Sequence, residues 1–139
     1  MLRAGLRLLL RITTMAPVKR VLFVCVENSN RSQMAEAFAR LHGGDRVQAL
    51  SAGSRPSGRI NPKAVRFMAE LGHDLSTHVS KSLDDVDGAF DAVITMGCGD
   101  ECPWIPSPRR EDWALPDPRD LDDDGYRAVR DEIQRRVKH

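Results

Sequence analysis

The segment from Cys25 to Ser32 has the residue types and the spacing of an anion-binding nucleophile. Cys25 is followed by five residues and then by Arg31, between a short apolar run and a helical segment. The intervening backbone can curl so that its N–H groups point at one centre, and the following helix adds the positive end of its dipole. Arg31 offers a planar fork for two oxygens of a tetrahedral oxyanion. Because this positive field favours the Cys25 thiolate, the loop predicts a nucleophile aimed at phosphate or a similar anion.

The backbone N–H groups of this loop are the expected oxyanion ligands, and they belong to Val26, Glu27, Asn28, Ser29, Asn30, Arg31 and Ser32. Ser32 can cap the helix, hydrogen-bond the thiolate, or do both. Asn28 can hold the loop through a left-handed backbone conformation or a side-chain bond. Glu27 is expected to point outward, because a carboxylate beside an anion site is repulsive. A cysteine that ends a buried strand can also be a simple core residue, but the flanking strand and helix favour the nucleophile.

Cys98 and Cys102 form a second cluster with possible chemistry, on a glycine-containing loop after another apolar run. They could form a thiol relay, in which one cysteine attacks an adduct on the nucleophile and the other resolves it into a disulfide. Two alternatives stay open: half of a zinc site, which only Cys25 and four scattered histidines could complete, and two inert buried thiols. We expect no bound metal.

Asp117 is the candidate proton donor. It stands before Pro118, on the loop after the last expected strand, where a carboxyl group over an oxyanion site can protonate a leaving group. An Asp-Pro pair is also a common turn former. Its position in a chain with the cysteine loop favours the catalytic interpretation.

The composition is typical of one water-soluble domain. The chain has 139 residues, 41% of them hydrophobic and 29% charged. Its formal net charge of +1 indicates neither a nucleic-acid partner nor a stable membrane association. Three cysteines are too few and odd in number for a disulfide framework, so we expect a reducing, cytoplasmic location.

Residues 1–17 differ from the rest and are predicted to be an N-terminal extension, either disordered or the product of a mis-assigned start. Their first 14 residues carry three arginines, several leucines and no acidic residue. The apolar run between the arginines is too short for a signal peptide or a membrane span. A small basic amphipathic helix is the alternative, but a biological start at Met15 is favoured. Residues 18–139 are expected to form the single domain.

Apolar runs alternate with helical patterns in this domain. Strands are expected at 20–24, 47–52, 92–95 and 113–115. Helices are expected at 32–42, from Pro62 to about 71, briefly at 82–86, and at 126–138, with Met34, Phe38 and Leu41 on the buried face of the first. This alternation predicts an α/β fold with a parallel sheet and right-handed crossovers. Ligands bind such sheets beyond the carboxyl ends of the strands, which is where Cys25 lies.

These segments together resemble the low-molecular-weight protein tyrosine phosphatase superfamily, and more closely its arsenate reductase branch. The resemblance covers residues 20–137. It rests on residues 21–25, 28–29 and 31–36 of the cysteine loop, the cysteine-containing stretch 95–103, residues 111–113, Asp117-Pro118, and residues 129–133. It implies a single three-layer domain with a four-stranded parallel sheet of order 2-1-3-4, flanked by helices.

The resemblance also implies roles. Cys25 would attack arsenate held by the loop and Arg31, and Asp117 would assist departure of an oxygen. Cys98 would attack the Cys25 adduct, releasing arsenite, and Cys102 would then form a disulfide with Cys98. No cofactor would be tightly bound. An external thiol reductant, either thioredoxin or a mycothiol- or glutaredoxin-type system, would reduce that disulfide.

This chain departs from the family at two places. Thioredoxin-coupled relatives usually separate the two relay cysteines by more than three residues, and shorter loops resemble relatives that use a low-molecular-weight thiol. Asn30 stands where many reductases carry an additional cysteine, so it is expected to be dispensable. The alternative activity is hydrolysis of phosphomonoesters by Cys25, Arg31 and Asp117, and a third possibility is an oxyanion-binding or phosphocarrier module. Arsenate reduction is favoured over both.

Overall fold

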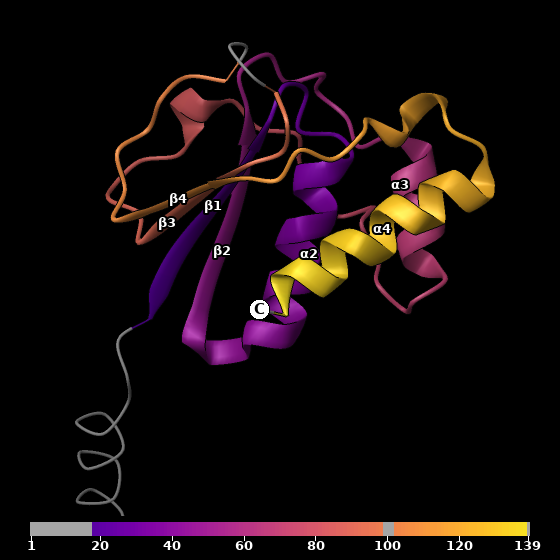
Figure 1. Ribbon diagram of the computed structural model, residues 1–139, viewed down its shortest axis with the longest axis horizontal. Coiled ribbons are helices and arrows are strands. Elements are labelled where there is room, and N and C mark those ends of the chain that lie inside the picture. Colours follow the sequence, from indigo (N-terminus) through magenta and orange to yellow (C-terminus); the bar gives the residue numbers. More distant parts are fainter. Residues whose placement is uncertain (1–17, 99–101, 139) are drawn as a thin grey trace, which may run out of the picture.

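A computed structural model describes residues 18–98 and 102–138; the predicted extension at 1–17 lies outside them. Four strands form one parallel sheet in the order β2-β1-β3-β4 (Figure 1). They are β1 (Lys19–Cys25), β2 (Val47–Gly53), β3 (Ala92–Thr95) and β4 (Arg109–Asp112). The predicted α/β class, the parallel pairing and the 2-1-3-4 order are confirmed.

Strand β1 lies inside the sheet because it is apolar on both faces. Leu22, Phe23 and Val24 are all buried, as expected for a strand covered on two sides. Its register pairs Cys25 with Gly53 of β2. The nucleophile candidate therefore ends an inner strand, at the carboxyl edge of the sheet.

The prediction for the fourth strand was wrong. It was expected at 113–115, but β4 is the charged stretch Arg109–Asp112. This strand lies at the sheet edge, where charged side chains are favoured and an apolar pattern is not needed. Trp113 and Leu115, which suggested the strand, are buried just beyond its end.

The α-helices of the described residues begin where the sequence offers a cap or a turn. Helix α2 (Arg31–Gly43) follows the cysteine loop directly. Helix α3 (Pro62–Ala69) starts with Pro62 after Asn61, whose side chain accepts a hydrogen bond from the Lys63 N–H. Helix α4 (Asp123–Val137) is capped by Asp122, which accepts from the Gly125 N–H.

Helices α2 and α4 pack together over one face of the sheet, with α3 beside them (Figure 1). Phe38, Phe67, Tyr126 and Ile133 are fully buried in this main core. The opposite face is covered by a 3-10 turn, Leu83–Asp85, and by loop residues such as Ile105. Leu41, expected to be buried, is 52% exposed near the end of α2. Within 18–98 and 102–138, no helix is long and apolar enough to span a bilayer.

Candidate active site

The Cys25 sulfur is buried and held by two polar groups. The backbone N–H of Asn28 donates to Cys25 Sγ at 3.2 Å, and Ser32 Oγ lies 2.7 Å from the same sulfur. Ser32 Oγ also accepts from Asn28 Nδ2 at 2.8 Å, which leaves its own proton to point at sulfur. Ser32 therefore contacts Cys25 and does not cap the helix, because Asn30 occupies the cap position.

The loop after β2 turns the carbonyl groups of the cysteine loop away from its centre. Three successive carbonyls accept backbone N–H groups from this loop: Cys25 from Ser54 at 3.3 Å, Val26 from Arg55 at 2.8 Å, and Glu27 from Ser57 at 3.0 Å. With the carbonyls fixed outward, the N–H groups can converge on an anion. The close packing of the β2 end against the cysteine loop requires a glycine at position 53, because a Cβ there would collide with the Val26 carbonyl.

Asn28 supports the loop with both its backbone and its side chain. Its φ of 51° is the left-handed conformation that was predicted. Its Oδ1 accepts from Gln33 Nε2 and from the backbone N–H of Lys81, each at 2.8 Å. Asn28 is fully buried, so it shapes the loop from behind.

A buried carboxylate, Glu36, lies on α2 one turn beyond the loop. It contacts His78 Nδ1 at 3.2 Å and Lys81 Nζ at 3.7 Å, and it accepts from Ser51 Oγ at 3.3 Å. Burial raises the pKa of the Glu36 carboxyl, but the His78 hydrogen bond and the charges of Lys81 and Arg40 outweigh it, so the pKa lies below its usual range. The ionised carboxylate thereby joins α2 to the segment that supports Asn28.

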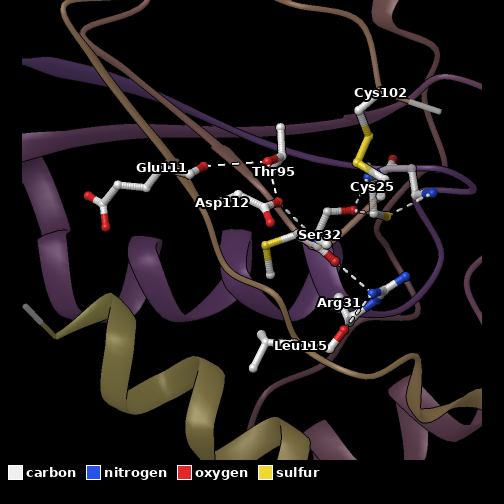
Figure 2. The surroundings of a disulfide bond; sticks show 12 residues. Cys25, Arg31, Ser32, Thr95, Cys102, Glu111, Asp112 and Leu115 are labelled. Carbon is white, nitrogen blue, oxygen red and sulfur yellow. Dashed lines mark hydrogen bonds between the residues drawn. A yellow bond between two sulfur atoms is a disulfide. The ribbon is translucent and has the colours of Figure 1, made fainter. Parts of the chain in front are cut away.

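Arg31 is fixed by two backbone carbonyls. Its Nη1 donates to Met96 at 2.6 Å and to Leu115 at 3.0 Å (Figure 2). These carbonyls follow β3 and β4, so the guanidinium joins the ends of three strands. Within 18–98 and 102–138, Nε and Nη2 have no protein acceptor, which leaves that edge of the fork for an oxyanion.

A cavity of about 330 Å³ brings four of the five predicted catalytic residues together. Its lining includes Cys25, Arg31, Asp117 and Cys98, together with Val26, Glu27, Ser29, Asn30, Arg55, Gly97 and Arg119. Asn28 and Ser32, also predicted as oxyanion ligands, are not part of this lining, and their side chains contact the loop and the Cys25 sulfur. Cys102 lines a separate cavity of about 400 Å³. A larger cavity of about 960 Å³ contains none of these residues.

Asp117 lies on the rim of the 330 Å³ cavity and is held by Arg119. Asp117 Oδ1 accepts the Arg119 backbone N–H at 3.0 Å, and Oδ2 lies 3.6 Å from Arg119 Nη2. Arg119 Nη1 also lies 3.3 Å from both carboxylate oxygens of Glu27. Glu27, which was predicted to point outward, belongs to the lining of this cavity, and its carboxylate is paired with Arg119. This ion pair connects the Asp117 loop to the cysteine loop.

Cys98 and Cys102 are joined in a disulfide, with Cα atoms 5.6 Å apart, whereas Cys25 is free. This separation is ordinary for a bridge, so three intervening residues suffice. Figure 2 shows the disulfide beside Cys25 and Ser32. Within the described ranges, no cluster of three His, Cys, Asp or Glu side chains could hold a metal ion.

Asn30 has a structural contact that the sequence did not reveal. Tyr126 Oη on α4 donates to Asn30 Oδ1 at 2.6 Å in the core. Burial and the nearby Asp117 charge raise the pKa of the Tyr126 hydroxyl, so it stays protonated and can donate. Asn30 is still predicted to be dispensable for the thiol chemistry. Its hydrogen bond with Tyr126, however, gives it a structural role.

The sequence also did not single out Gln33, Gly53 or Arg119. Gln33 is fully buried in α2, and its amide Nε2 donates to Asn28 Oδ1 and to the Val79 carbonyl. Gly53 ends a strand, but its close approach to the cysteine loop comes from parallel pairing with β1. Arg119 follows Asp117 by two residues, and no pattern in the sequence places it against Glu27.

The sequence profile described as low molecular weight phosphotyrosine protein phosphatase matches residues 20–101. The chain therefore belongs to this family of phosphatase-like proteins. Within it, the chain belongs to the arsenate reductase branch, as its relatives indicate. A "glutaredoxin arsenate reductase" from Synechocystis is 37% identical over 126 residues, which cover 88% of this chain and 95% of the relative.

Two solved structures support the same assignment. "An arsenate reductase in the phosphate binding state" matches with a TM-score of 0.80 and 37% identity, over 87% of this chain and 95% of that one. A thioredoxin-dependent arsenate reductase from Corynebacterium glutamicum matches with a TM-score of 0.73 and 39% identity, over 92% of this chain and 62% of that one.

Proposed function

We propose that the protein reduces arsenate to arsenite with Cys25 as the nucleophile. The loop N–H groups and Arg31 hold the oxyanion, and Cys25 Sγ attacks arsenic. One oxygen leaves as water, with a proton from Asp117. The product of this step is a covalent sulfur–arsenic adduct on Cys25.

The two remaining cysteines supply the electrons. The Cys98 thiolate attacks Cys25 Sγ, the sulfur–arsenic bond breaks, and its electron pair reduces As(V) to As(III), which leaves as arsenite. The Cys102 thiolate then attacks Cys98 Sγ and expels the Cys25 thiolate. The chain is left with a Cys98–Cys102 disulfide and a free Cys25.

One observation carries this proposal: Cys98 lines the same cavity as the free Cys25 while it is bonded to Cys102. This is the thiol arrangement that the relay would leave after one turnover. The relatives described as arsenate reductases add independent support.

The oxidised protein then needs an external thiol. We favour a dithiol protein such as thioredoxin, because one relative is described as thioredoxin-dependent. A glutaredoxin system is the alternative, since another relative carries that name. Both systems deliver two electrons to a disulfide by thiol–disulfide exchange.

Coupled turnover tests the proposal. NADPH oxidation is followed with thioredoxin, thioredoxin reductase and arsenate, and p-nitrophenyl phosphate hydrolysis is measured in parallel. We expect arsenate-dependent NADPH loss that Cys25→Ser abolishes and that Asp117→Asn lowers by about 10²-fold or more. Enzyme-like phosphate hydrolysis, with no arsenate-dependent consumption of any thiol reductant, would refute it.

Phosphomonoester hydrolysis is the second candidate function. The matched family profile is that of a phosphatase, and the cavity contains Cys25, Arg31 and Asp117, which suffice for this reaction. Hydrolysis needs neither Cys98 nor Cys102. Cys98→Ser therefore separates the two activities, because it should stop arsenate reduction and leave any phosphatase activity intact.

A further inference from the structure

The largest of the three cavities, at about 960 Å³, lies toward the amino ends of the strands. Its lining includes the first residue of each strand, namely Lys19, Val47, Ala92 and Arg109. The ends of α2 and α4 form its other side, and Figure 1 shows these helix ends beside the start of β2. Because Cys25 lies at the carboxyl end of β1, the proposed reaction makes no use of this cavity.

The wall that the sheet contributes is apolar at its centre. Along β1, Val21 and Phe23 are two residues apart, so both face the cavity. Ile94 and Trp113 continue this surface, and Val137 of α4 lines the helix side. Val21 and Val137 are only half-buried, which leaves apolar surface open. A ligand with an apolar body would cover it.

The rim of the cavity is strongly basic. Six Lys or Arg side chains line it against two acidic ones, although the net charge of the whole chain is only +1. Both acidic side chains are already engaged. Glu111 pairs with Arg109 at 2.6 Å, and Asp112 accepts from Thr95 Oγ1 at 2.6 Å. The cavity therefore holds more positive charge than its own carboxylates neutralise.

Part of this positive charge compensates the helix ends. The C-terminal ends of α2 and α4 together present about one negative elementary charge. Arg46 donates to the His42 carbonyl at the end of α2, at 3.2 Å. Arg135 and Arg136 share the carboxylate of Glu132. These arginines therefore have partners in the protein, and the remaining excess is carried by lysines.

Lys19 and Lys138 are the cations left for a ligand. Both are exposed, and neither ammonium group has a hydrogen bond or an ion pair with any described residue. Lys19 pairs in the sheet with Val47, the residue after Arg46. Burial, followed by the charge of Lys138, lowers the pKa of the His42 imidazole, so Lys138 lies near it. Both lysines thus lie where the starts of β1 and β2 meet the end of α2.

We propose that this cavity binds a small amphipathic carboxylate, such as a fatty acid. The aliphatic chain lies along the apolar wall, and the carboxylate pairs with Lys19 and Lys138. A carboxylate is favoured over a phosphate, because the rim offers single ammonium charges and not the backbone N–H groups and arginine fork that surround Cys25. This inference goes beyond the proposed function, since binding needs neither Cys25 nor arsenate.

Calorimetry measures this binding directly. Decanoate is titrated into the full chain below its micelle concentration, and decyltrimethylammonium serves as a ligand of equal chain length and opposite charge. We expect saturable binding of decanoate and none of the cation. Octanoate, which is shorter by two CH₂ groups, should bind about tenfold more weakly. Equal binding of the two charged ligands, or no saturable binding of decanoate, would overturn the proposal.

Two substitutions test the role of the free lysines. Lys19→Gln and Lys138→Gln each remove a charge without removing a contact within the described residues. Each should weaken decanoate binding about threefold, and the double variant about tenfold. Arg59→Gln is the matched control, because Arg59 is also exposed but lines none of the three cavities, and it should leave the affinity unchanged. Full affinity in the double variant would contradict the proposed carboxylate site.

The fluorescence of Trp113 reports where the ligand lies. The chain has two tryptophans, so Trp104→Phe leaves Trp113 as the only one. Decanoate should change its emission with the Kd that calorimetry gives. At constant ionic strength, inorganic phosphate, an anion suited to the Cys25 cavity, should not displace decanoate. Binding without a response of Trp113, or displacement by phosphate, would place the ligand elsewhere and refute the assignment.

Discussion

The sulfur of Cys25 meets a backbone N–H and a serine hydroxyl, and one residue controls both contacts. Asn28 donates its own N–H to the sulfur, and its Nδ2 orients Ser32 Oγ. These two hydrogen bonds hold the sulfur in place at the end of β1. At the scale of single residues, Asn28 is therefore a positioning residue for the proposed nucleophile.

Two substitutions of Asn28 separate its backbone and side-chain roles. Asn28→Ala and Asn28→Gly lose the same side-chain bonds, but only alanine is strained at a φ of 51°. We expect both variants to reduce arsenate at least about tenfold more slowly, and the alanine variant to be the less stable of the two by up to about 1 kcal/mol. Urea unfolding and coupled turnover measure these effects. An alanine variant more stable than the glycine variant would contradict the backbone argument.

At the scale of elements, a carboxylate joins α3 to α4. Glu70, the residue after α3, accepts from Arg127 Nη2 at 2.8 Å and from Arg130 Nη1 at 2.7 Å. The hydrogen bond from Arg127, followed by that from Arg130, lowers the pKa of the Glu70 carboxyl to about 2. Helix α4 also supplies Tyr126 to Asn30, so this junction helps to hold the helix against the cysteine loop.

This junction should make stability depend on pH in a defined window. Because the pKa of Glu70 is lower in the folded state than the usual 4.5, its contribution is complete above about pH 4.5 and is lost as the pH falls through about 2. Glu70→Gln should therefore lower the urea midpoint at pH 7, and the difference should shrink between pH 4.5 and 2. A difference that persists at pH 2, or none at pH 7, would contradict this role.

The elements also show what the sequence could and could not predict. Strand β1 and its cysteine loop were predictable, because apolar residues, the Cys-to-Arg spacing and the helix follow one another along the chain. Strand β4 was not predictable, because a strand at the sheet edge can consist of charged residues and then shows no apolar pattern. The ion pair between Glu27 and Arg119 was not predictable either, because it depends on how the loop after β4 returns over the sheet.

At the scale of the whole molecule, the parallel sheet brings the candidate catalytic groups to one edge. Cys25 ends β1, Cys98 follows β3, and Asp117 follows β4. The disulfide extends from this edge into a second cavity, so the proposed path of electrons runs from Cys102 through Cys98 to Cys25.

A single turnover without external reductant tests the central claim most directly. The protein is fully reduced, freed of reductant and mixed with excess arsenate, and both arsenite and disulfides are measured. We expect one arsenite and one Cys98–Cys102 disulfide per chain with Cys25 free, and no arsenite from Cys98→Ser. Arsenite released in full by Cys98→Ser, or none released by the unmodified protein, would contradict the relay.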